Sequence, residues 1–96
     1  MNLFRSKRLK DRLATLGREE TMIANYLDGL DDNDIVDLEL AIRLGERSYE
    51  NTIELSKIHL EMRQYDLYKI ALMNQTKIND ALMILKQKHH NMVLCH

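Results

Sequence analysis

The chain has 96 residues, of which 45% are apolar and 30% are charged, and its net charge at pH 7 is −1. This length allows one small domain, and the apolar fraction argues against wholesale disorder. Proline is absent, glycine occurs three times and only 5% of the residues are aromatic, so a many-stranded β fold is excluded and an all-α fold is expected.

The sequence also indicates where the protein works. No apolar run approaches the roughly 20 residues that span a bilayer, and the N-terminus lacks the apolar stretch of a secretory signal. The single cysteine, Cys95, cannot form an internal disulfide. We therefore expect a soluble, cytoplasmic protein that folds as a single helical domain over residues 1–96.

Opposite charges are separated along the chain. Residues 1–18 carry six basic residues and one acid, residues 19–66 carry thirteen acids and four bases, and residues 67–96 carry four lysines and one aspartate. The net charges of these blocks are +5, −9 and +3. This pattern favours attraction between blocks, either within one folded chain or between copies, and salt should weaken it.

Two short helices are expected in residues 1–29. The first has leucines at helical spacing and ends near Leu16, because Gly17 occupies the position of a left-handed C-terminal cap. The second runs over residues 18–28 and is stopped by Gly29.

A run of helix N-cap residues, Asp31-Asp32-Asn33-Asp34, precedes a long periodic segment and marks its start. Residues 30–88 form either one continuous helix or an antiparallel hairpin, because the apolar stripe changes face twice. Average helix lengths favour a break, at Gln64-Tyr65-Asp66 or at Asn74-Gln75-Thr76. Residues 89–96 are expected to form a tail.

The apolar stripes of the long segment define a candidate oligomer or partner interface with coiled-coil-like packing. Its residues are Ile35, Leu38, Ile42, Tyr49, Leu67, Ala71, Asn74, Ile78, Leu82 and Leu85. Asn74 would fix the register, because a single polar residue in an apolar seam disfavours slipped pairings. The chain has few residues outside this segment to cover the stripes, so a homodimer or larger assembly is expected.

No group of residues predicts catalysis or a cofactor. The only cluster of metal-ligand types lies at the C-terminus, in His89, His90, Cys95 and His96. Adjacent histidines on a helix diverge by about 100°, and the usual paired spacings are missing, so we predict no metal site. The acids around Asp34 fit helix capping better than a calcium loop. An active site would have almost no loop to occupy, so we expect a non-enzyme without cofactors.

Besides self-association, two other functions stay open. The acidic middle block could bind a basic protein surface, as a small adaptor or inhibitor does. A basic N-terminal segment could contact nucleic acid or an anionic membrane surface through phosphates. The residues of this segment are Arg5, Lys7, Arg8, Lys10 and Arg12. They are spread around the helix rather than gathered on one side, so we favour a non-enzymatic assembly protein that self-associates through apolar helix faces.

The segment Met62–Lys86, MRQYDLYKIALMNQTKINDALMILK, resembles the C-terminal helix of inner-rod subunits of type III secretion systems. In that family a tyrosine is followed by a basic residue, an alanine and a closing apolar pair, here Tyr65, Lys77, Ala81, Ile84 and Leu85. The chain departs from the family by its higher charge, by Cys95 and by the ten residues after Lys86. The resemblance covers 25 residues. It implies a small secreted helical subunit that polymerises through this helix.

Overall fold

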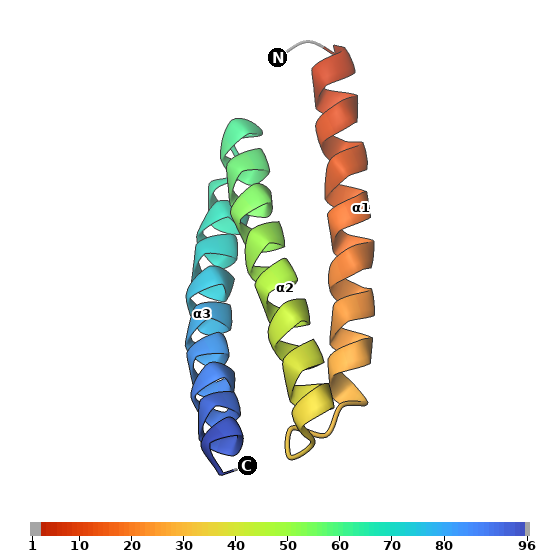
Figure 1. Cartoon of the computed structure of the whole chain (residues 1–96). Coiled ribbons are helices and arrows are strands. Elements are labelled where there is room, and N and C mark those ends of the chain that lie inside the picture. The colour runs from red at the N-terminus through yellow and green to blue at the C-terminus, as the bar shows by residue number, and fades with distance from the viewer. Residues whose placement is uncertain (1–2, 96) are drawn as a thin grey trace.

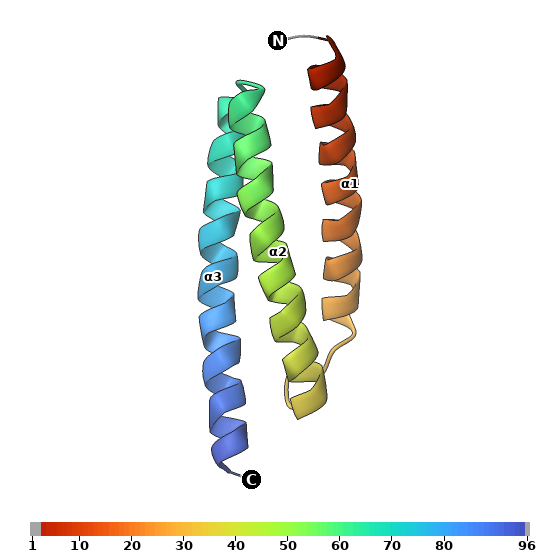
Figure 2. The same ribbon diagram turned by 45° about the horizontal axis from the view of Figure 1, so that its top comes forward.

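The protein folds into three long helices. The computed structural model describes residues 3–95, with side chains from Arg5 onward, and contains no strand within them. Helix α1 spans Leu3–Asp28, α2 spans Ile35–Glu61 and α3 spans Tyr65–Leu94. The helices run up and down in chain order, with α2 between α1 and α3 (Figure 1). A second view shows the same order (Figure 2). The expected all-α fold is confirmed.

The expectation of two short N-terminal helices is wrong, because α1 continues through Gly17 to Asp28. Gly17 does not have a positive φ, and a Cβ built on it would meet nothing within 4 Å. A glycine inside a helix costs only about 1 kcal/mol relative to alanine. Packing of α1 on α2 before and after this position offsets that cost. The predicted stop at Gly29 agrees with the observed end of α1.

A row of side chains at steps of four and three along α1 faces α2. Its members are Leu9, Leu13, Leu16, Glu20, Ile23 and Leu27. An apolar cluster in this interface combines Leu9, Leu13 and Leu16 with Leu55, Ile58 and Met62 of α2. Because the row continues past Gly17, one face of α1 is covered along most of its length, and this explains why the helix does not break there.

Glu20 forms a polar layer inside the α1–α2 interface. Ser48 Oγ donates to Glu20 Oε2 at 2.7 Å, and Asn51 Nδ2 donates to Glu20 Oε1 at 2.9 Å. Ser48 and Asn51 are only 7% and 4% exposed, so loss of the carboxylate would leave two buried polar groups unpaired. A polar contact of this kind fixes the register of two packed helices.

Asp34 begins α2 as its N-cap, as the run of N-cap residues predicts. Its Oδ1 accepts hydrogen bonds from the N–H groups of Val36 and Asp37 at 2.9 and 3.1 Å. Asp37 Oδ2 in turn accepts from the N–H of Asp31 at 3.0 Å. These carboxylates satisfy backbone donors around the helix start, which is the role that helix capping assigns to them.

The long segment is a hairpin, and it breaks next to the first of the two expected places. Arg63 has a φ of 59°, in the left-handed region. The N–H groups of Arg63 and Gln64 donate to the carbonyls of Leu60 and His59 at 3.0 and 2.8 Å. This is the Schellman arrangement that ends many helices, here with arginine where glycine is usual. Gln64 Oε1 also lies 2.9 Å from His59 Nδ1, which ties the turn to the last part of α2.

Helices α2 and α3 approach closely at Gly45. A Cβ built on Gly45 would lie 2.7 Å from Leu82 Cδ2, well inside the usual carbon–carbon contact distance. Leu82 therefore lies directly over the backbone of α2, and it is only 5% exposed. Beyond this contact α3 continues as a helix to Leu94, through most of the segment expected to be a tail.

Candidate functional site

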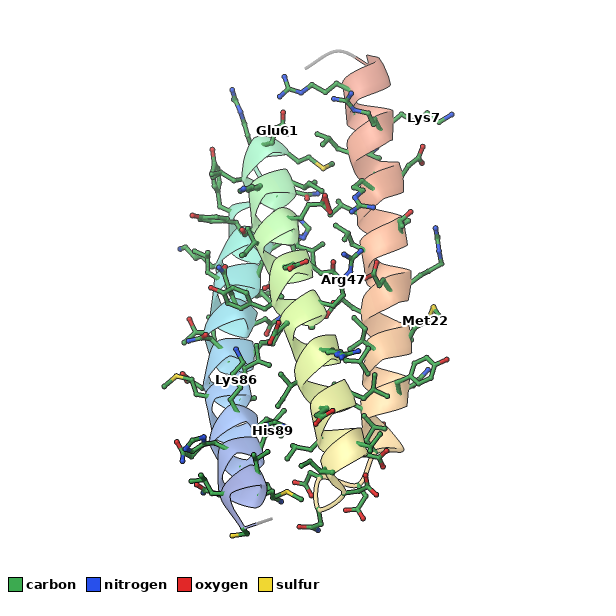
Figure 3. All side chains as sticks on the ribbon, in the orientation of Figure 1. Lys7, Met22, Arg47, Glu61, Lys86 and His89 are labelled. Atoms are coloured by element: carbon green, nitrogen blue, oxygen red, sulfur yellow. The ribbon has the colours of Figure 1, made fainter. Side chains whose placement is uncertain are left out.

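A ladder of ion pairs runs along the α1–α2 interface. Its members are seven residues apart on each helix, and Arg5 pairs with Glu61, Arg12 with Glu54 and Glu19 with Arg47. Arg47 lies between α2 and α1, whereas Lys7 points away from α2 (Figure 3). Arg5 and Arg12 of the predicted anion-binding segment are thus engaged within the chain. Lys7, Arg8 and Lys10 are exposed.

In the Glu19–Arg47 pair the environment shifts the pKa of both side chains. The Arg47 guanidinium donates to the Glu19 carboxylate and holds the pKa of that carboxyl below its usual range. The same hydrogen bond raises the pKa of Arg47. The Arg47 side chain is 53% exposed, so water screens the attraction and the pair makes only a modest contribution to stability.

Three side chains in the C-terminal third of α3 contact acids elsewhere in the chain. Lys86 pairs with Glu46, Lys88 with Asp32 and His89 with Glu39, at N···O distances of 3.5, 3.3 and 3.1 Å. Lys86 and His89 lie along α3, and His89 points toward α2 (Figure 3). The charge blocks allow attraction either within one folded chain or between copies of it. These contacts and the α1–α2 ladder are attractions within one folded chain.

Helix α3 buries little of its apolar surface. Within the described residues, α3 has two buried residues, Ala71 and Leu82, whereas α2 has seven, of which four are polar. Nine of the fourteen exposed large hydrophobic side chains lie on α3, namely Tyr65, Leu67, Ile70, Leu72, Met73, Met83, Ile84, Val93 and Leu94. Apolar side chains concentrated on one exposed helix are typical of a surface that contacts another protein.

Five exposed residues form a line along α3, which we call the α3 stripe. Ile70, Met73, Lys77, Asp80 and Ile84 follow one another at steps of three, four, three and four. The three apolar members are 51%, 58% and 69% exposed in chain order. Within residues 3–95, no ion pair involves Lys77 or Asp80. The stripe therefore presents apolar groups and two opposite charges to the solvent.

The predicted interface residues fall into three groups in the structure. Leu38, Ala71 and Leu82 are buried inside the folded chain. Leu67 and Asn74 are exposed. The half-buried residues are Ile35, Ile42, Tyr49, Ile78 and Leu85.

None of the ten predicted interface residues belongs to the α3 stripe. The heptad spacing from Ile70 to Ile84 is visible in the sequence and could have identified the stripe. Lys77 and Asp80 interrupt its apolar pattern, and this is why a search for continuous apolar stripes passes over it.

The described part of the chain contains neither a cluster of metal ligands nor a membrane-spanning helix. Within residues 3–95 no group of three His, Cys, Asp or Glu side chains is arranged to hold a metal ion. Cys95 is an exposed thiol, and His96 of the C-terminal cluster lies outside the described residues. None of the described helices combines the length and the apolar character needed to cross a bilayer.

Comparisons of this chain with protein-family models, curated protein sequences and solved structures give no match.

Proposed function

We propose that this chain is a non-enzymatic helical assembly protein that self-associates through α3. The observation that carries the proposal is the uneven distribution of exposed apolar side chains. Among the side chains described, from Arg5 to Cys95, nine exposed large hydrophobic ones lie on α3, whereas α2 has three and α1 has two. Burial of apolar surface is the main driving force of protein association, so the face of α3 gains most from being covered.

The other two functions have less support. The adaptor function needs free acids on α2, and four of these acids already contact basic side chains of α1 or α3, namely Glu39, Glu46, Glu54 and Glu61. Nucleic-acid or membrane binding needs a free basic segment, and Arg5 and Arg12 of that segment pair with α2. The inner-rod alternative would use α3 as well, and it differs from our proposal in requiring secretion and polymerisation.

The experiment is a measurement of molar mass by light scattering during gel filtration, at low and at high salt. We expect a dimer or larger species that persists at high salt, because apolar contacts are not screened. In the variant Ile70→Gln/Met73→Gln/Ile84→Gln, we expect the mass to fall to that of the monomer. Glutamine is a good helix former, so the change removes apolar surface without weakening α3 itself.

The matched control is Met22→Gln/Tyr26→Gln, which makes the same kind of change at exposed apolar positions of α1. These side chains are 58% and 62% exposed. We expect this variant to associate as the unmodified chain does. A monomer at every salt concentration, or an equal loss of association in both variants, would rule out self-association through α3.

A further inference from the structure

The order of residues along the α3 stripe limits what can cover it. Read from the N-terminal end, the stripe is Ile70, Met73, Lys77, Asp80 and Ile84, so a positive and a negative charge lie at its centre with apolar residues outside them. A surface whose central charges are opposite and adjacent is complementary to itself when it is rotated by 180° about an axis between them.

We infer that the α3 stripe pairs with the same stripe of a second copy, antiparallel, about a two-fold axis that passes between Lys77 and Asp80. This inference rests on the proposed function and adds the partner, orientation and register. In antiparallel heptad packing, Lys77 lies opposite the partner's Asp80 and Asp80 opposite the partner's Lys77. Met73 then lies opposite the partner's Ile84, so that apolar residues meet on both sides of the central charges.

Other pairings of the stripe with itself are less favourable. A parallel pairing in register places Lys77 opposite the partner's Lys77 and Asp80 opposite the partner's Asp80, which brings like charges together. An antiparallel pairing shifted by seven residues places Lys77 opposite the partner's Met73 and leaves the charge partly desolvated and unpaired. The central charges therefore specify one orientation and one register, as polar residues in helix seams commonly do.

Lys77 and Asp80 can form ion pairs with a second copy because neither residue forms an ion pair within residues 3–95 of its own chain. Lys86 and Lys88, farther along α3, pair with Glu46 of α2 and with Asp32 of the preceding loop. Lys77 and Asp80 form no ion pair within residues 3–95, and both are exposed. An ion pair with a second copy would give both residues a partner without breaking any contact of the fold.

The test reverses the charge of Lys77 and of Asp80, first one at a time and then together. Lys77→Asp places two acidic residues opposite each other at both central positions of the homodimer, and Asp80→Lys places two basic residues there. We expect each variant to dimerise at least about tenfold more weakly than the unmodified chain. An equimolar mixture of the two variants restores opposite charges across the axis, so we expect it to form a heterodimer of near-normal affinity. The double variant Lys77→Asp/Asp80→Lys should also dimerise.

Two controls separate this effect from general changes in charge and folding. Lys10→Asp and Asp11→Lys make the same charge changes at exposed positions of α1, and we expect them to leave dimerisation unchanged. Circular dichroism should show equal helix content in all variants. The affinities are measured by analytical ultracentrifugation.

Results that contradict the proposed function can be distinguished from results that contradict only the antiparallel pairing. A monomeric unmodified chain overturns both the proposed function and this pairing. An unmodified dimer that tolerates Lys77→Asp and Asp80→Lys overturns the pairing and leaves self-association in place. An unmodified dimer that both variants weaken, without recovery in the mixture or the double variant, also overturns the pairing.

Discussion

Replacing Gly45 with alanine tests the close contact between α2 and α3. The new methyl carbon would lie 2.7 Å from Leu82 Cδ2, where carbon atoms prefer about 3.5–4.0 Å, so Leu82 would have to move by about 1 Å. Extra volume in a packed interface typically costs about 1–3 kcal/mol. Alanine is a better helix former than glycine by about 1 kcal/mol, and this gain offsets part of the packing cost. We therefore expect Gly45→Ala to destabilise the fold by about 0–2 kcal/mol.

Gly17 provides the matched control, because it is also inside a helix but has open space around it. A Cβ on Gly17 meets nothing within 4 Å, and its φ is not positive. Gly17→Ala should therefore stabilise the fold by about 0.5–1 kcal/mol and raise Tm by about 2–8 °C. The difference between the two substitutions isolates the packing cost at Gly45, because the gain in helix propensity is common to both.

The assay is urea denaturation followed by circular dichroism at one fixed protein concentration, since self-association would add to the apparent stability. Leu82→Ala alone should cost about 2–5 kcal/mol. In that background Gly45→Ala should become stabilising, because the methyl group no longer meets the leucine. If Gly45→Ala stabilises the unmodified fold as much as Gly17→Ala does, the close approach of α3 to Gly45 is refuted.

Three further substitutions test particular features of the fold. Arg63→Gly should stabilise it by about 0.5–1 kcal/mol, because glycine adopts the left-handed conformation without strain; an unchanged urea midpoint would contradict this. Glu20→Ala should destabilise it by about 1–3 kcal/mol in the same assay, because Ser48 and Asn51 lose their acceptor, and a neutral result would mean that water replaces the carboxylate. The pKa of Glu19 is lowered in the folded state, so its stabilising effect is present above its unfolded pKa and is lost as pH falls through the folded pKa. Glu19→Gln should therefore reduce stability at pH 7 and converge with the unmodified chain in acid, whereas a difference independent of pH would exclude this linkage.

The helix boundaries that local signals mark could be predicted from the sequence. Asp34 begins α2 because its carboxylate accepts from backbone N–H groups two and three residues ahead, and such a cap requires no distant part of the chain. For the long segment the sequence leaves one helix or a hairpin open, with two possible places for a break, and the structure breaks beside the first of them. The predicted helix end at Gly17 is wrong because packing against another helix overrides the local signal. Glycine signals a helix end locally, but α2 packs against α1 on both sides of Gly17 and keeps the helix continuous.

Packing decides which apolar residues become surface, and this explains why only Leu67 and Asn74 of the ten predicted interface residues are exposed. Leu38, Ala71 and Leu82 have the spacing of an interface stripe, and the hairpin covers them with the chain's own helices. Periodicity alone cannot distinguish a stripe covered by a neighbouring helix from one left open. Ile70 and Ile84 stay open because they lie outside the face of α3 that meets α2, and only the arrangement of the hairpin identifies that face.

The same hairpin changes the expected effect of salt. The separated charge blocks alone allow copies of the chain to attract one another electrostatically, which salt would weaken. In the folded chain the acids of α2 already pair with the helices on either side, as Arg12 does with Glu54 and Lys86 with Glu46. Salt should therefore act first on these exposed pairs, and so on the packing of α1 against α2. In the proposed assembly, association through the α3 stripe would depend mainly on apolar contact, and the two central charges would select the register. We therefore expect moderate salt to weaken the fold more than the assembly.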